Sequence, residues 1–144
     1  MEISLTLCLP RDEASVPFVR HVCGHALRHL GVEAECIGDV ELAITEACTN
    51  VVKHSTDAQD EYKVSVEVDG ELCEIRVTDA GMGFDHEARS GEIAQLSAES
   101  GRGISLMHAL VDRVKFVSRP EEGTIVHLTK SLRAAEGARR LTSA

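Results

Sequence analysis

A carboxylate, an amide and an ammonium recur on one face of a predicted helix. Glu46, Asn50 and Lys53 are spaced by four and then three residues, and residues at these spacings are neighbours on a helix surface. A carboxylate can act as a general base, an amide oxygen can bind Mg²⁺, and an ammonium can reach a phosphate as a point charge. The same pattern is common on solvated helix faces, so it needs support from the rest of the sequence.

Glycine-containing motifs give that support. In Asp79-Ala80-Gly81-Met82-Gly83 a carboxylate follows an alternating apolar strand, where it can accept a hydrogen bond from an exocyclic amine. Gly101-Arg102-Gly103 is expected to open a helix, whose N–H groups and dipole attract phosphate. Gly123-Thr124 begins the last predicted strand. The combination and order of these motifs are more specific than any one of them.

Apolar periodicity predicts the elements that position these motifs. Helices are expected at residues 15–31, 36–54 and 104–111. Strands are expected at residues 3–9, 64–68, 73–77, 114–117 and 124–129, with Asp69-Gly70 as a hairpin turn. Two apolar helix stripes are expected to face the core. The first contains Phe18, Val19, Val22, Cys23, Ala26, Leu27 and Leu30, and the second contains Val40, Ile44, Ala47, Cys48 and Val51.

Length and charge limit the classes of function. The 144 residues suit one domain, expected at residues 1–132, with a disordered tail at residues 133–144. A net charge of −9 argues against direct nucleic-acid binding. It also requires local neutralisation of any bound polyphosphate. No stretch approaches the roughly 20 apolar residues of a membrane span, and no secretory signal is evident. A cytoplasmic protein without a membrane anchor is expected.

Several other sites can be weighed against the sequence. A P-loop is excluded because no Gly-Lys-Ser/Thr occurs, and the glycines match neither a Rossmann fingerprint nor an EF-hand. His21, His25 and His29 are spaced as a transition-metal site could be, but Arg20 and Arg28 share their side of the helix. A solvated cationic face is therefore favoured over a metal site. The five cysteines form no Cys-x-x-Cys pair and are expected to be reduced core thiols.

The chain resembles the GHKL ATPase superfamily, whose Bergerat fold is shared by histidine-kinase catalytic domains and gyrase. Glu46-Ala47-Cys48-Thr49-Asn50 is similar to its N box, Asp79 to Gly83 to its G1 box, and Gly101 to Gly103 to its G2 box. These phrases and the ending at residues 123–130 are most similar to the anti-sigma factor serine protein kinases. The resemblance covers roughly residues 3–132. It implies an α/β two-layer sandwich, a mixed and mostly antiparallel sheet with three helices on one face, and an ATP lid at residues 85–100.

The resemblance also implies ATP and Mg²⁺ as cofactors. Asp79 would accept a hydrogen bond from the adenine N6 and Thr124 would join this network, so that ATP is preferred to GTP. Asn50 would bind Mg²⁺, and Glu46 would be the general base for a serine hydroxyl or water. The remaining residues of the implied nucleotide site are Lys53, His54, Gly81, Gly83, Gly101, Arg102 and Gly103.

The function implied by the resemblance is an anti-sigma factor with ATP-dependent serine protein kinase activity. Such a protein would sequester a sigma factor, phosphorylate an anti-anti-sigma (STAS-domain) protein, and form a homodimer through the first strand and helix. One alternative is a nucleotide-binding anti-sigma module that has lost phosphate transfer. Another is a detached histidine-kinase catalytic domain, although no separate dimerisation and phospho-acceptor helix pair is evident. Gyrase-type ATPases are disfavoured because they need a transducer domain.

Overall fold

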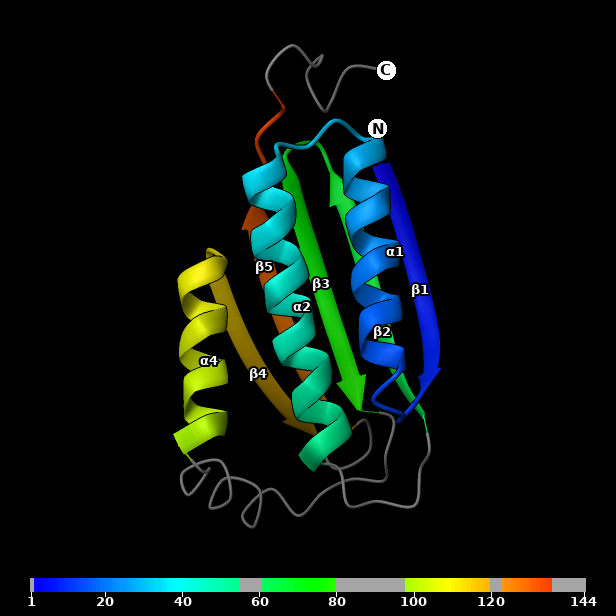
Figure 1. Ribbon diagram of the computed structural model, residues 1–144, viewed down its shortest axis with the longest axis vertical. Helices are drawn as coiled ribbons and strands as arrows, with labels where there is room; N and C mark the ends of the chain where they lie inside the picture. Colours follow the sequence, from blue (N-terminus) through cyan, green and yellow to red (C-terminus); the bar gives the residue numbers. More distant parts are fainter. Residues whose placement is uncertain (1, 55–60, 80–97, 120–122, 136–144) are drawn as a thin grey trace.

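The computed structural model describes residues 2–54, 61–79, 98–119 and 123–135. These residues form five strands and three helices, shown in Figure 1. In chain order they are β1 (Glu2–Pro10), α1 (Ser15–His29), α2 (Ala34–His54), β2 (Glu61–Asp69), β3 (Leu72–Asp79), α4 (Ala98–Leu110), β4 (Arg113–Arg119) and β5 (Gly123–Ser131). None of the helices in these ranges is long and apolar enough to cross a membrane.

The strands form one sheet in the order β1-β2-β3-β5-β4. Every pairing between these strands is antiparallel, so the expectation of a mixed sheet was wrong for the described residues. The reason lies in the position of β5. Helix α4 returns the chain so that β4 runs in the same direction as β3, as a parallel pair would require. However, β5 lies between β3 and β4 and is antiparallel to both.

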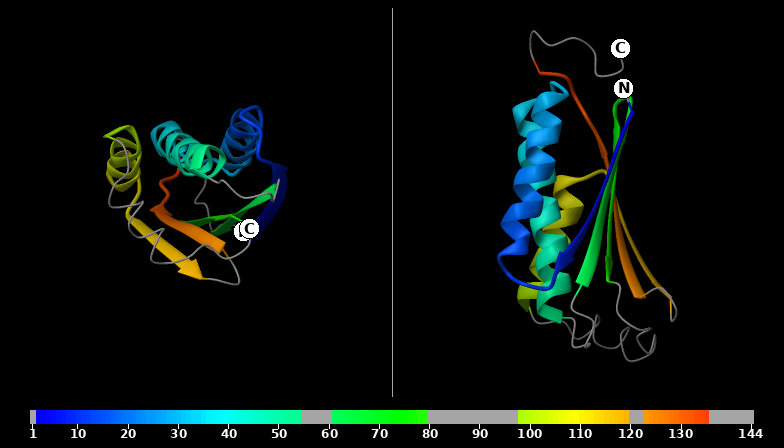
Figure 2. Two further views of the ribbon diagram at one scale, coloured as in Figure 1. Left: turned by 90° about the horizontal axis from the view of Figure 1, so that it is seen from below. Right: turned by 90° about the vertical axis from the view of Figure 1, so that its right-hand side faces the viewer.

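The three helices cover one face of the sheet, as predicted, and the core lies between the two layers (Figure 2). The expected stripe of α2 is fully confirmed, because all five of its apolar residues are buried. Val64, Val66 and Val68 of β2 and Cys73, Ile75 and Val77 of β3 face this core. One residue of the expected α1 stripe differs: Phe18 is 53% exposed. Phe18 precedes the buried Val19 and lies about 100° from it around the helix, at the border of the stripe.

Two glycines make the sharp turns that the sequence indicated. Gly31 follows the end of α1 with a φ of 81°, and Gly70 has a φ of 63° in the hairpin between β2 and β3. Positive φ is strained for residues that carry a Cβ atom. The hairpin pairs Asp69 with Leu72. The same register continues along both strands and pairs Tyr62 with Asp79. The turn therefore sets the register of the functional end of β3.

The chain stays attached to the domain beyond the boundary expected at residue 132. Arg133 donates hydrogen bonds to the carboxylate of Glu33, at 3.0 Å for the shortest pair of atoms. Ala134 forms a bridge to Val32, and the Ala135 N–H donates to the Gly31 carbonyl at 2.7 Å. These three residues are thus fixed at the start of α2. Residues 136–144 of the expected tail lie outside the described residues.

Candidate functional site

The elements that carry the predicted site residues meet at one end of the molecule. The last turn of α2, the end of β3, the start of α4 and the start of β5 all lie at the lower end in Figure 1. The end of β1 and the start of α1 lie at the same end. The fold therefore gathers motifs that are up to about 80 residues apart in the chain, from Glu46 to Thr124.

Asp79 is the last residue of β3 and is 0% exposed. Burying a carboxylate is costly unless a positive or hydrogen-bonding group compensates it. In this structure, the Arg11 guanidinium forms an ion pair with Asp79 Oδ1, and its own side chain is only 7% exposed. Arg11 belongs to none of the sequence motifs. Arg11 follows the end of the first predicted strand, and Asp79 follows the end of a strand that runs in the same direction. This position at the same end of the sheet is the feature of the sequence that could have indicated the contact.

Thr124 lies beside Asp79 when the strand register is followed. Thr78 of β3 is opposite Ile125 of β5. Continuing that antiparallel register by one residue places Thr124 level with Asp79. Thr124 is also paired with Ser118 of β4. The backbone therefore brings Asp79 and Thr124 side by side where β3 ends and β5 begins, and the role of Thr124 in adenine binding stays a prediction.

Glu46 and Asn50 share one face of the unbroken helix α2, and both are half-buried. Thr45 and Thr49 line a groove toward α1, and each residue turns an α-helix by about 100°. Glu46 and Asn50 are therefore turned away from α1. Relative to the buried stripe, Thr45 lies on one side of α2 and Asn50 lies on the other side. Helix α4 packs against α2 on that other side (Figure 1). The predicted site is therefore expected on the side of α2 against which α4 packs.

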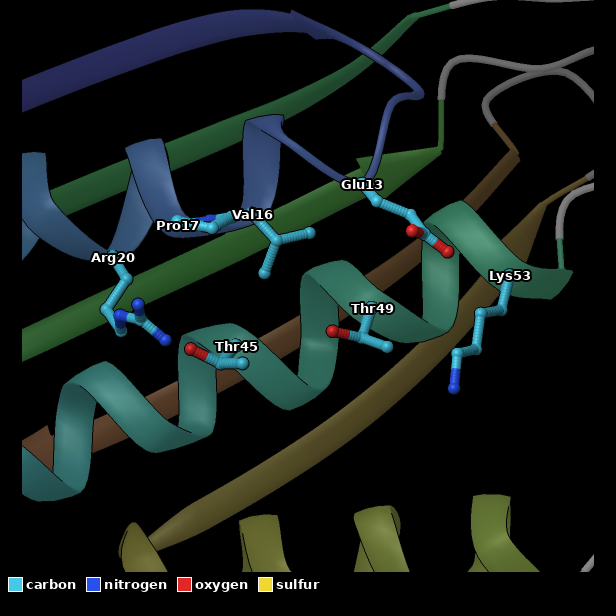
Figure 3. Close-up of a pocket in the computed structure, with 7 residues that line it drawn as sticks. All are labelled: Glu13, Val16, Pro17, Arg20, Thr45, Thr49 and Lys53. Atoms are coloured by element: carbon cyan, nitrogen blue, oxygen red, sulfur yellow. The ribbon is translucent and has the colours of Figure 1, made fainter.

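Lys53 lies one turn beyond Asn50, near the end of α2. Its exposed side chain lines a groove of about 250 Å³ between α1 and α2, together with Glu13, Val16, Pro17, Arg20, Thr45 and Thr49. Figure 3 shows the Lys53 side chain extending away from α1. Lys53 therefore sits at the rim between this groove and the face that carries Asn50.

The glycine motif before α4 is placed differently from the prediction. Helix α4 begins at Ala98, so Gly101, Arg102 and Gly103 lie within the helix rather than opening it. Ala98 and Glu99 are good helix formers, and they extend the helix before the glycines. The first N–H groups of a helix have no hydrogen-bond partner within the helix. In α4 these groups precede Arg102 and Gly103. The N-terminal end of α4 still faces the site end of the molecule.

Several predicted site residues fall wholly or partly outside the described residues. Gly81 and Gly83 are among residues 80–97, which include the expected lid. His54 ends α2, but its side chain is not described, and neither are the side chains of Arg102 in α4 and Thr124 in β5. Asp79 and the helix residues Glu46, Asn50 and Lys53 are thus the part of the predicted site whose side chains are described.

The comparisons with known proteins agree with this arrangement of elements. The family model of the histidine kinase-like ATPase domain matches residues 9–130. The chain belongs to this family. The matched segment runs from the end of β1 to the end of β5, so it contains every element that carries a predicted site residue.

Two curated relatives are similar over nearly their whole length. A serine-protein kinase RsbW from Listeria monocytogenes is 33% identical over 140 residues, which cover 90% of this chain and 88% of the relative. An anti-sigma F factor from Pasteuria penetrans is 31% identical over 142 residues, which cover 94% of this chain and 92% of the relative.

A solved structure supports the same fold. The RsbU and RsbW domains of a Mycobacterium tuberculosis protein match 92% of this chain with a TM-score of 0.68. The sequence identity is 21%, and this chain spans 33% of the length of that one. The family model confirms the predicted superfamily, and this structural match confirms the predicted two-layer α/β architecture.

The residues present in this histidine kinase-like ATPase domain suit a nucleotide. Asp79 provides an acceptor of the kind that an exocyclic amine needs, at the end of a strand. Asn50 adds a neutral oxygen on α2 of the type that Mg²⁺ accepts. Among the described residues, no group of three or more histidine, cysteine or acidic side chains is placed to hold a metal by itself. His21, His25 and His29 are exposed on α1, as expected for a solvated face.

The cysteines are free thiols. Burial raises the pKa of Cys23, Cys48 and Cys73 to about 12, so these thiols are protonated at neutral pH. Protonated, enclosed thiols are poor nucleophiles and poor metal ligands. Cys8 differs from the expectation of a core thiol because it is exposed, on the side of β1 that faces away from the helices.

Proposed function

We propose that this protein is an ATP-dependent serine protein kinase that acts as an anti-sigma factor. The family and the relatives named as serine-protein kinase and anti-sigma F factor support this activity. The observation that carries the proposal is the meeting of the α2 face with Glu46 and Asn50, the β3 end with Asp79 and the start of α4 at one end of the fold.

Adenine recognition is assigned to the strand ends. Asp79 accepts a hydrogen bond from the 6-amino group, and Thr124 lies next to it across the sheet. Guanine has a carbonyl oxygen at that position, and it would face the lone pairs of the carboxylate. Gly81 and Gly83 let the backbone approach the base and ribose. This arrangement gives a preference for ATP over GTP.

The phosphates and the metal are assigned to α2 and α4. Asn50 binds Mg²⁺ through its amide oxygen, and Lys53 contacts phosphate with its ammonium. His54, Gly101, Arg102 and Gly103 contribute to the phosphate end of the site. The dipole at the start of α4 adds a favourable potential for anions.

Glu46 is assigned the proton transfer. When bound, Mg²⁺ and ATP supply charge neutralisation and the γ-phosphoryl group. Glu46 accepts the proton of a partner's serine hydroxyl while the bond between the serine oxygen and phosphorus forms and the bond to ADP breaks. Because the carboxylate is half-buried on α2, it is held by the helix backbone rather than by a loop.

The partners follow from the assigned activity. The protein binds a sigma factor, and it phosphorylates a serine of an anti-anti-sigma protein with a STAS domain. It acts in the cytoplasm, as a homodimer, without contacting nucleic acid directly. A nucleotide-binding anti-sigma module without transfer activity is the alternative. The retained Glu46 favours the kinase.

Phosphate transfer tests the proposal. The protein is incubated with Mg²⁺, ATP and each STAS-domain protein of its own genome, and the products are identified by phosphopeptide mass spectrometry. The proposal expects one phosphoserine on one STAS partner, formed with ATP, and formed more slowly by Asp79→Asn when ATP is limiting. ATP binding without phosphoserine on any of these partners would instead establish the alternative.

A further inference from the structure

The Arg11–Asp79 ion pair is a charged contact at the predicted adenine-binding carboxylate, and the sequence motifs do not indicate it. It joins the connection between β1 and α1 to the end of β3. The same carboxylate is assigned to the adenine 6-amino group under the proposed function. Two different hydrogen-bond donors are therefore assigned to one acceptor group.

The connection that carries Arg11 is held firmly over the strand ends. The Asp12 N–H donates to the Pro10 carbonyl at 2.8 Å, and the Ser15 N–H donates to the Asp12 carbonyl at 2.9 Å. The Ser15 hydroxyl lies 2.6 Å from the Tyr62 hydroxyl. Tyr62 is buried and is directly opposite Asp79 in the β2–β3 pairing. The guanidinium is thus delivered to Asp79 by an ordered backbone.

Burial makes the two donors compete. Asp79 is 0% exposed and the Arg11 side chain is 7% exposed, so the carboxylate is enclosed in this conformation. A base that donates to Asp79 must reach a group that solvent does not reach here. When Arg11 moves away, the Asp79 carboxylate becomes accessible. The 6-amino group of adenine then supplies an N–H donor in place of the guanidinium.

We propose that Arg11 is an affinity- and specificity-determining residue of the nucleotide site, because its guanidinium holds Asp79 until adenine replaces it. The inference rests on the proposed function, in that Asp79 is the adenine-reading carboxylate. Adenine binding and the Arg11–Asp79 pair are then antagonistic. Each weakens the other by the same factor, as linkage requires.

The test compares Arg11→Met, which keeps the side-chain length but removes the charge, with Arg133→Met. The control also breaks an arginine–carboxylate pair, to Glu33, and changes the net charge equally. Arg133 contacts the start of α2, at the end of the molecule opposite the site. Calorimetry of the full chain gives ATP and GTP affinities, and thermal unfolding is measured with and without saturating ATP.

Arg11→Met is expected to bind ATP roughly three- to tenfold more tightly, because the closed population is removed. GTP affinity should not gain, so the ratio of ATP to GTP affinity rises. Without nucleotide the variant should unfold at a lower temperature than the wild type, and this deficit should shrink in saturating ATP. Arg133→Met should show neither the affinity gain nor the ATP-dependent recovery.

Weaker or unchanged ATP binding in Arg11→Met would overturn the proposal, since Arg11 would then support Asp79 in the complex or be indifferent to the base. If Arg11→Met does not fold, Arg11→Gln is measured with the same expectations. Measurements on the wild type distinguish failure of the proposed function from failure of the role of Arg11. Wild-type protein without adenine selectivity refutes the proposed function itself, whereas a selective wild type with no gain in the variant refutes the role of Arg11 alone.

Discussion

Asp79 combines complete burial with a charged side chain. A buried acceptor contributes to specificity mainly because a mispaired group is costly, by roughly 1–3 kcal/mol. We therefore expect Asp79→Asn to weaken ATP binding by roughly 1–3 kcal/mol, because the amide can turn an N–H toward the amino group of adenine. GTP affinity should change less, so the selectivity narrows. Calorimetric titration with both nucleotides on folded protein checks this, and equal loss for ATP and GTP would contradict it.

His127 makes stability depend on pH. It lies on β5 between Arg76 of β3 and Lys115 of β4. Its Nε2 atom is buried and has no hydrogen-bond partner among the residues that the structure describes. Burial, and then the charge of Arg76, lower the pKa of His127 below its usual 6.5. The charges of Lys115 and Arg113 act in the same direction, and the charge of Glu74 opposes them.

The sign of the effect follows from the lowered pKa. Near and below pH 6.5 the unfolded chain takes up a proton that the folded protein does not, so stability falls as the pH drops from about 7 toward 5. His127→Gln should flatten this fall, whereas His25→Gln, at an exposed position on α1, should retain it. Chemical denaturation at several pH values measures the free energy of unfolding. An unchanged slope in His127→Gln would rule out this source of pH dependence.

At the scale of the elements, Lys130 ties three of them together. From β5 its ammonium donates to the Leu110 carbonyl at the end of α4, at 2.7 Å, and to Asp39 of α2, at 3.1 Å. The Lys130 side chain is 11% exposed. We expect Lys130→Met to reduce the free energy of unfolding by roughly 1–3 kcal/mol, because a carbonyl and a carboxylate lose their donor.

The exposed pair of Arg133 and Glu33 is the matched comparison for Lys130. Its arginine side chain is 59% exposed, and pairs in water contribute at most about 1 kcal/mol. Urea denaturation of Lys130→Met and Arg133→Met should therefore give clearly different losses. Similar losses would mean that Lys130 does not hold α4 against the sheet.

The elements were predictable wherever one period dominated the sequence. Val40, Ile44 and Val51 recur at helical spacing in α2 and are all buried, and the alternating valines of β2 are buried as well. Helix α4 begins at Ala98 and not at the predicted residue 104, because Ala98 and Glu99 extend the helix and the glycines do not end it. The contact of Arg11 with Asp79 depends on the path of a connection, which periodicity does not describe.

For the whole molecule, β1 is an edge strand with half-buried apolar residues, and α1 beside it exposes Phe18. An open strand edge next to apolar surface is a typical site of association. We expect a homodimer through β1 and α1, which Phe18→Glu would dissociate. Phe116→Glu, on the opposite edge strand, is the control. Light scattering that shows only a 15.6 kDa species for the wild type would contradict the dimer.

One end of this fold is proposed to hold a nucleotide on Asn50 and to transfer phosphate with Glu46. The most direct measurement is the rate of phosphate transfer to a STAS-domain partner at saturating ATP, run beside a titration of ATP affinity. Asn50→Ala should lose both binding and transfer. Glu35→Ala, an exposed glutamate in the first turn of the same helix, should lose neither.

Glu46→Ala should bind ATP as tightly as the wild type or more tightly, since a negative charge near the phosphates is removed. Its transfer rate should fall roughly 10²- to 10⁴-fold, the usual contribution of a positioned general base. If Glu46→Ala transfers phosphate as fast as the wild type, Glu46 is only a solvated carboxylate on α2 and the account of the site is wrong.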